Sequence, residues 1–164
     1  VVIDLRGNVP TRVRKVREGE LDAVVVAMAG LDRLGLAAEA SQVLAAQQML
    51  PAAGQGALAV QARQGNEELR QILCQINDVV TERCVAVERA CLAALDGGCH
   101  LPLGILATPD GDKLVAEGCL CSPDGEVVIR ATRKGAPGDA ERVGMALADD
   151  LMAQGGRMVL DGLA

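Results

Sequence analysis

The stretch that decides the fold is ERACLAALDGGCHLPLG, residues 88–104. It opens as the end of an apolar helical pattern, which Gly97-Gly98 then break, as a pair that tolerates positive φ should. Cys99 follows, and Pro102 removes a backbone donor just before an extended apolar run begins. The pattern predicts a thiol on a short loop between a helix and a strand. The residues alone leave two interpretations open, a buried structural cysteine, which is the commoner fate, and a functional thiol.

On both sides of this loop the sequence is typical of an α+β domain. Upstream, Asp78 or Thr81 caps a helix that runs to about Leu95. Its apolar stripe has helical spacing and consists of Val80, Cys84, Val87, Cys91 and Leu95. Downstream come three strand-like runs separated by turn signals, then a last helix, at 103–107, 113–121, 126–132 and 139–154. The order predicts a three-stranded antiparallel sheet with its helices on one face.

Toward the N-terminus the pattern changes to alternating strand and helix. Residues 1–5 are predicted to form a buried β-branched strand, and 9–18 a helix capped by Asn8. Residues 21–28 form a nearly continuous apolar run, typical of a strand covered on both faces. Strand, helix and strand with short connections predict a βαβ unit and a parallel sheet.

Between these regions lies a hinge-like segment, PAAGQG at 51–56. Residues 57–63 are predicted to form a further strand. We expect that strand either to remain an exposed edge or to be covered by association. Asn66 caps a predicted helix that runs to about Ile76.

The composition bounds the class of protein. The chain has 164 residues, is half hydrophobic and contains no Phe, Tyr or Trp, so the core must be aliphatic. No run is long enough to span a membrane, and no signal peptide is present at the start, which predicts a soluble protein. The net charge of −6 argues against a nucleic-acid surface, as does the lack of aromatic stacking residues.

Six cysteines show no Cys-x-x-Cys pair and only one histidine accompanies them, so neither a zinc site nor any other metal site is expected. A reducing cytoplasm fits this usage better than a disulfide scaffold. Cys119 and Cys121 are expected on one face of a strand, and Cys84 and Cys91 are expected to pack inward from a helix.

Basic residues gather locally in this acidic chain. Arg14, Lys15 and Arg17 are best interpreted as a solvated helix face. Arg6 follows the first predicted strand, Arg12 lies in the first turn of the next helix, and Arg33 follows the second strand. Because ligands of parallel sheets bind beyond the carboxyl ends of the strands, these three arginines predict a site for a small polyanion. The alternative is that they pair with surface carboxylates.

Four motifs, in order, resemble the porphobilinogen deaminase (hydroxymethylbilane synthase) family. They are LRGNVPTR at 5–12, AGLDRLG at 29–35, LPAAGQGA at 50–57 and the stretch at 88–104. The resemblance implies a transferase of tetrapyrrole and heme biosynthesis that condenses porphobilinogen units head to tail into hydroxymethylbilane and releases ammonia. It also implies a dipyrromethane cofactor bound to Cys99 through a thioether. By the same resemblance the cleft is lined by Arg6, Gly7, Arg12, Ala27, Arg33, Gln55 and Gly56.

The resemblance also implies a domain plan, α/β followed by α+β. Residues 1–50 would belong to a periplasmic-binding-protein-like βαβ domain, 51–77 to the hinge with a strand and helix of the first domain, and 78–164 to the cofactor-attachment domain. The chain resembles the C-terminal half of the family, whose catalytic aspartate would lie upstream of Val1. We therefore expect a fragment that is inactive by itself and able to self-associate, and a monomeric parent. The alternative function is a non-catalytic lobe that binds carboxylated small molecules.

Overall fold

The structure is a computed structural model, and it describes residues 1–95 and 101–162. It divides into two compact units, residues 1–45 and 46–164, and each is described by itself. Cys99 and the Gly97-Gly98 pair lie outside the described residues. In the part of the chain that is described, none of the helices has the length and apolarity needed to cross a bilayer.

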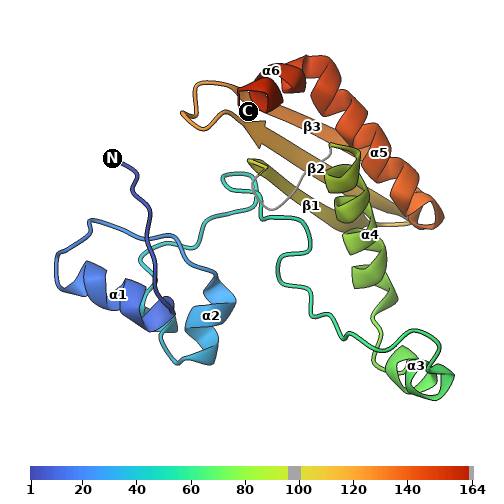
Figure 1. The fold of residues 1–164 in the computed structure, drawn as a ribbon, viewed down its shortest axis with the longest axis horizontal. Helices are drawn as coiled ribbons and strands as arrows, with labels where there is room; N and C mark the ends of the chain where they lie inside the picture. The colour runs from blue at the N-terminus through green and yellow to red at the C-terminus, as the bar shows by residue number, and fades with distance from the viewer. Residues whose placement is uncertain (96–100, 163–164) are drawn as a thin grey trace. The chain divides into compact units, whose positions relative to one another are not determined.

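The second unit is built on a three-stranded antiparallel sheet, with strands β1 (Leu103–Asp110), β2 (Lys113–Cys121) and β3 (Val128–Gly135). Their order is β1-β2-β3, so β2 is the central strand (Figure 1). Helices α4 (Val79–Ala94) and α5 (Ala140–Leu151) pack together and cover one face of this sheet. The predicted α+β arrangement, with helices on one face, is confirmed.

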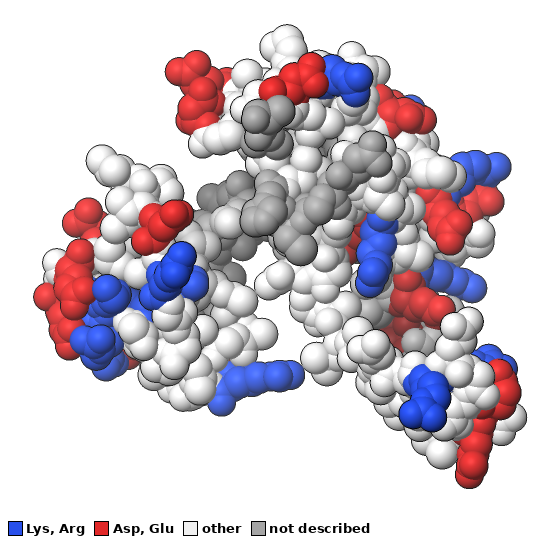
Figure 2. Space-filling model, viewed as in Figure 1, with Lys and Arg blue, Asp and Glu red and all other residues white. Residues whose placement is uncertain are grey.

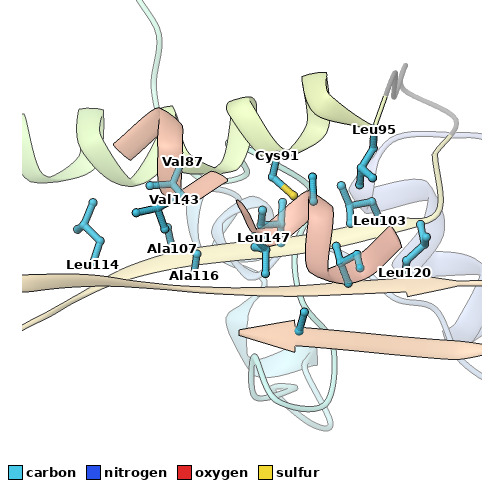
Figure 3. Packing of buried hydrophobic residues seen from close by; sticks show 14 of the residues in the cluster. Val87, Cys91, Leu95, Leu103, Ala107, Leu114, Ala116, Leu120, Val143 and Leu147 are labelled. Carbon is cyan, nitrogen blue, oxygen red and sulfur yellow. The ribbon is translucent and has the colours of Figure 1, made fainter. Parts of the chain in front are cut away.

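The core lies between these helices and the sheet. Figure 3 shows Val87 and Cys91 of α4 directed toward the same interior as Leu147 of α5 and Ala116 of β2. Gly144 of α5 sits so close to α4 that an added Cβ would be 2.2 Å from the backbone oxygen of Val87. The core is therefore aliphatic and tightly packed, and helix–helix contact depends on a residue without a side chain.

The helix termini follow the sequence. Asp78 caps α4, and its carboxylate accepts a hydrogen bond from the Thr81 N–H at 2.7 Å. Asn66 caps α3 (Glu67–Cys74) in the same way. The stripe of α4 is buried from Cys84 onward, but Val80, in the first turn, is 49% exposed, so that part of the prediction is wrong.

The C-terminal segment continues past the predicted end of its helix. A single turn, η2 (Pro137–Asp139), leads into α5, and α5 runs into a π-helical stretch, η3 (Met152–Gly156), and then α6 (Arg157–Asp161). Gly155 has φ +103°, a value that side-chain-bearing residues rarely adopt, and it marks a kink rather than an end. Val159 of α6 is buried, which ties this extension to the core.

The first unit contains helices α1 (Val9–Arg17) and α2 (Met28–Arg33) and a short turn, η1 (Ala37–Glu39). Asn8 caps α1 as predicted, accepting the Thr11 N–H at 3.0 Å. Leu31 is buried, and the Val9 side chain approaches Gly30, so the two helices touch.

The predicted strands at 1–5, 21–28 and 57–63 are not formed. A strand exists through its ladder, and none of these segments has a ladder partner among the described residues. Several of their apolar residues are exposed, among them Val2, Val25 and Leu58. The parallel sheet expected for the N-terminal region is therefore not observed.

Candidate functional site

The segment that carries Cys99 is anchored at both ends, although Cys99 itself is not described. On its N-terminal side, α4 ends at Ala94 and Leu95 is buried in the core. On its C-terminal side, the carbonyl of Pro102 accepts the Cys121 N–H at 3.1 Å just before β1 begins. The expected loop between a helix and a strand thus has the predicted flanks, while the position of the thiol remains a prediction.

One buried carboxylate ties this helix to the hinge-like segment. Glu88 of α4 is only 5% exposed. Its Oε2 accepts the Gly54 N–H at 2.7 Å, and its Oε1 accepts the Ala107 N–H of β1 at 2.9 Å. Both carboxylate oxygens therefore bind backbone donors, which is how a buried charge avoids the cost of lost solvation.

The segment before Gly54 lies along the outer edge of β1. The carbonyl of Pro51 accepts the Ile105 N–H at 2.7 Å, and Leu50 is packed where a side chain on Gly104 would be. The Glu88 carboxylate accepts the next N–H that points outward from β1, that of Ala107. Two backbone donors on the open edge of β1 are therefore already bound. The edge is thus covered rather than left open to another chain.

Gln55 and Gly56 lie on the turn that Glu88 holds in place. Gly54 and Gly56 have φ +74° and +85°, so the turn needs glycines at both positions. Gln55 and Gly56 are exposed, and the Gln55 N–H is bound to the carbonyl of Ala52. Two of the predicted cleft residues are therefore presented to solvent on a turn fixed to α4 and β1.

A hollow of about 470 Å³ lies beside this turn, against the outer face of α4. Its lining includes Gly54, Ala57, Val85, Arg89 and Leu92. Arg89, the residue after Glu88, is exposed and has no ion-pair partner among residues 1–95 and 101–162. An apolar hollow with one unpaired guanidinium suits an organic anion.

In the first unit, two predicted cleft residues are in contact. The Arg12 guanidinium donates from Nε to the carbonyl of Gly7 at 2.9 Å and from Nη2 to the carbonyl of Leu5 at 3.3 Å. Gly7 has φ +123°. Arg12 therefore shapes the loop before α1, a structural role that sequence reasoning missed.

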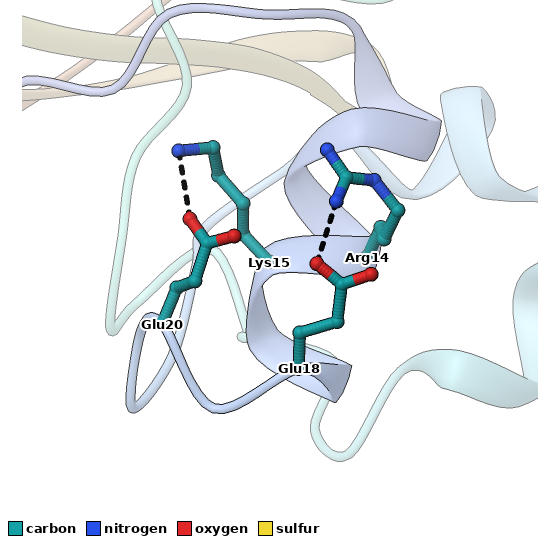
Figure 4. A network of polar contacts seen from close by, with 4 residues as sticks. All are labelled: Arg14, Lys15, Glu18 and Glu20. Carbon is teal, nitrogen blue, oxygen red and sulfur yellow. Dashed lines mark hydrogen bonds and ion pairs between the residues drawn. The ribbon is translucent and has the colours of Figure 1, made fainter.

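The remaining cations of this unit fall into two groups. Arg14 pairs with Glu18 at 2.5 Å and Lys15 with Glu20 at 3.1 Å (Figure 4), while Arg17 pairs with Glu39. Figure 2 shows basic and acidic side chains side by side over α1. The three cations lie on a solvent-facing helix surface, as predicted, and the ion pairs add that this surface is neutralised.

The ion pairs on this face also lower the pKa values of the carboxyl groups that take part in them. The hydrogen bond from Arg17 lowers the pKa of Glu39, and the one from Lys15 lowers the pKa of Glu20. By contrast, Arg6 and Arg33 are exposed and have no acidic partner in the described part of the chain. These two cations remain available for an external anion.

The structure brings together only some of the predicted cleft residues. Ala27 is the exposed residue before α2, and Arg33 is the last residue of that helix. Gln55 and Gly56 belong to the other unit, which is described separately. The convergence of all seven residues on one cleft therefore stays a prediction. Sequence reasoning missed Glu88, whose position next to Val87 and four residues after Cys84 on the helix is the signal that indicates its burial.

Comparison with known proteins gives two family matches. Residues 1–71 match the model described as porphobilinogen deaminase, dipyromethane cofactor binding domain. Residues 82–153 match the porphobilinogen deaminase C-terminal domain. Together the two models cover most of the chain, in the order in which the sequence motifs occur.

Individual relatives agree with the family models. The chain is 44% identical over 161 residues to a porphobilinogen deaminase of Roseiflexus sp. (strain RS-1), covering 98% of this chain and 53% of that protein. It is 46% identical over 159 residues to one of Thiobacillus denitrificans, covering 97% and 52%. The chain spans about half the length of the curated relatives it matches. On these matches the chain belongs to the porphobilinogen deaminase family.

Proposed function

We propose that this chain acts in the porphobilinogen deaminase reaction, in which porphobilinogen units are joined head to tail into hydroxymethylbilane with release of ammonia. The observation that carries the proposal is the succession of both family domains in one chain, with the Cys99 motif between α4 and β1. The periplasmic-binding-protein-like fold and the domain boundaries after residues 50 and 77 are part of the same proposal.

The residues present fit the dipyrromethane cofactor that the family uses. Porphobilinogen units carry acetate and propionate side chains, so the cofactor and its products accumulate carboxylates. The first unit neutralises Arg14, Lys15 and Arg17 with its own acids but leaves Arg6 and Arg33 without acidic partners in the described residues. A guanidinium fork matches carboxylate geometry, and several cations offset the repulsion among the carboxylates.

Each predicted residue then has a role in binding. Cys99 holds the cofactor through a thioether, and the bound cofactor supplies the tethered pyrrole end to which substrate units are added. Arg6, Arg12 and Arg33 bind carboxylates, and Arg12 does so while two of its N–H groups shape the Gly7 loop. The small residues Gly7, Ala27 and Gly56, with Gln55, let the ligand approach the backbone.

Intact mass spectrometry tests the covalent part of the proposal. The unmodified chain has a mass of 16.9 kDa, and a bound dipyrrole adds a discrete increment. The increment is expected on the chain as purified from the cells that express it, and it should vanish in Cys99→Ser. Cys74→Ser is the matched control, because Cys74 is exposed and far from the motif in sequence. An increment that survives Cys99→Ser would overturn the assignment of the attachment site.

Binding of porphobilinogen to the chain, followed by calorimetry, tests the cation set. Arg33→Ala should weaken binding about tenfold, the effect of losing one charge-assisted contact. Arg14→Ala should leave binding unchanged, since Glu18 already neutralises Arg14. Equal effects of the two substitutions would contradict the proposed cleft.

The same proposal covers catalysis and location. The resemblance assigns the family's catalytic aspartate to none of the four motifs, so we propose that residues 1–164 by themselves convert no porphobilinogen. Measurable production of ammonia from porphobilinogen by the pure chain would contradict this. We propose the cytoplasm as the location, which separate fractionation of cells expressing the protein would test.

A further inference from the structure

Two thiols lie next to each other outside the site described above. Cys119 and Cys121 are alternate residues of β2, and their sulfurs are 3.5 Å apart. The core residues of β2, Leu114, Ala116 and Leu120, face α4 and α5. Because side chains alternate along a strand, the two cysteines project from the opposite face of the sheet.

A hollow of about 280 Å³ opens at this pair of thiols. Its wall includes the two cysteines together with Leu50, Gly104, Val128 and Arg130. Cys119 is flanked by Gly104 on β1 and by Arg130 on β3, its cross-strand partners. Cys121 is half-buried, so the pair can be reached from the hollow.

The separation of the sulfurs selects the geometry of a bound centre. With metal–sulfur bonds of about 2.3 Å, a 3.5 Å separation corresponds to an angle of about 100° at the centre. A linear two-coordinate ion would need the sulfurs about 4.6 Å apart at the same bond length. The pair therefore suits a bent or pyramidal centre.

The residues around the two sulfurs also limit which kind of centre can bind there. No group of three or more His, Cys, Asp or Glu residues that could hold a metal ion occurs in the described part of the chain, so a fully protein-ligated zinc site is not formed there. Arg130 places a positive charge beside Cys119, which disfavours a bare cation. A neutral centre that takes two sulfurs and keeps an organic group in the apolar part of the hollow meets both conditions.

We propose that Cys119 and Cys121 form a bidentate dithiol site for a neutral, trivalent, thiophilic centre of the arsenical type. The site does not depend on the proposed enzymatic function. With phenylarsine oxide the balance is simple: two S–H bonds and the arsenic–oxygen bonds break, and two arsenic–sulfur bonds and one water molecule form. No electrons are transferred. Burial, and secondly Cys121, raises the pKa of Cys119 to about 11, so this sulfur enters the exchange as S–H and its proton leaves in the water molecule.

Native mass spectrometry of the full chain with phenylarsine oxide tests the proposal. One adduct per chain is expected, with loss of one water, and bound phenyl should be visible in the ultraviolet because the chain has no aromatic residue. Cys119→Ser and Cys121→Ser should each weaken binding about 100-fold or more, since each leaves only one sulfur. Cys74→Ser and Cys99→Ser should keep the adduct.

Folding of the variants is checked by circular dichroism, with Cys119→Ala as a second substitution if the buried hydroxyl of Ser unfolds the chain. A competition experiment on the unmutated chain is independent of folding defects. A small dithiol such as dimercaptopropanol should remove the adduct, while an equal concentration of glutathione should not. Retention of the adduct in Cys121→Ser, its loss in Cys99→Ser, or its removal by glutathione would each overturn the proposal.

Discussion

Replacement of Glu88 by Ala should destabilise the second unit more than the replacement of any other acidic residue of α4 by Ala. The change removes two charge-assisted hydrogen bonds, to the Gly54 N–H at 2.7 Å and the Ala107 N–H at 2.9 Å. Each such bond contributes about 1.5–3 kcal/mol. Removal of the buried charge offsets part of this lost stability, because the carboxylate no longer has to be desolvated. We expect a net loss of about 2–4 kcal/mol in the free energy of unfolding.

Urea denaturation followed by circular dichroism measures the loss. Glu82→Ala is the matched control, because Glu82 lies on the same helix and is exposed, and its substitution should cost about 0.5 kcal/mol or less. Amide hydrogen exchange locates the effect: the Gly54 and Ala107 amides should lose protection in Glu88→Ala. The loss of unfolding free energy in Glu88→Gln should lie between those of Glu88→Ala and Glu82→Ala, because the Gln side chain has one oxygen and can accept only one of the two N–H groups. Equal costs at positions 88 and 82, or unchanged exchange at Gly54 and Ala107, would refute the reasoning.

Three further outcomes are expected. Asp78→Ala should lower the urea midpoint by removing the α4 cap. Because the Thr81 N–H lowers the pKa of Asp78, this stabilisation is present above the ordinary Asp pKa and is lost as pH falls through the folded pKa, and acid titrations of Asp78→Ala should lack that dependence. Gly144→Ala should cost about 3 kcal/mol or more in urea melts, because its Cβ would overlap the α4 backbone, whereas Gly138→Ala, with open space around it, should change little. In peptide-mapped labelling with a thiol reagent, Cys74 should react at once and Cys91 only on unfolding, since burial raises the pKa of Cys91 to about 12.

The C-terminal half of the fold could be predicted because its signals are local. Asp78 and Asn66 accept the backbone donors that their positions suggest, and the turn at Gly111 joins β1 to β2. The stripe from Cys84 to Leu95 is buried because the sheet it needs is formed by the residues that follow it. Pattern and partner lie in the same segment of chain, so the prediction holds.

The N-terminal half could not be predicted in the same way, because strands depend on distant partners. Residues 21–28 have the apolar run of a buried strand, yet Val25 is 62% exposed, and no strand among residues 1–95 and 101–162 pairs with this run. Helix α1, by contrast, forms as predicted, since the Asn8 cap and the ion pairs of α1 lie within the unit. Helix α2 was not predicted, and it begins at Met28, the last residue of the run expected as a strand. A helix satisfies its own backbone, and a strand does not.

The candidate site depends both on local sequence signals and on partners that are distant in the sequence. The sequence predicts Arg6, Arg12 and Arg33 as anion ligands by their type and position, and that role stays a prediction. Arg14, Lys15 and Arg17 are paired with acidic residues, whereas Arg6 and Arg33 have no acidic partner in the described residues. The sequence did not identify Glu88 as a bridge, because a glutamate at such a position has the same pattern whatever groups its carboxylate reaches. The partners of Glu88, Gly54 and Ala107, lie 34 and 19 residues away. Such a bridge can be found only in three dimensions, and it joins the turn with Gln55 and Gly56 to the helix that leads to Cys99.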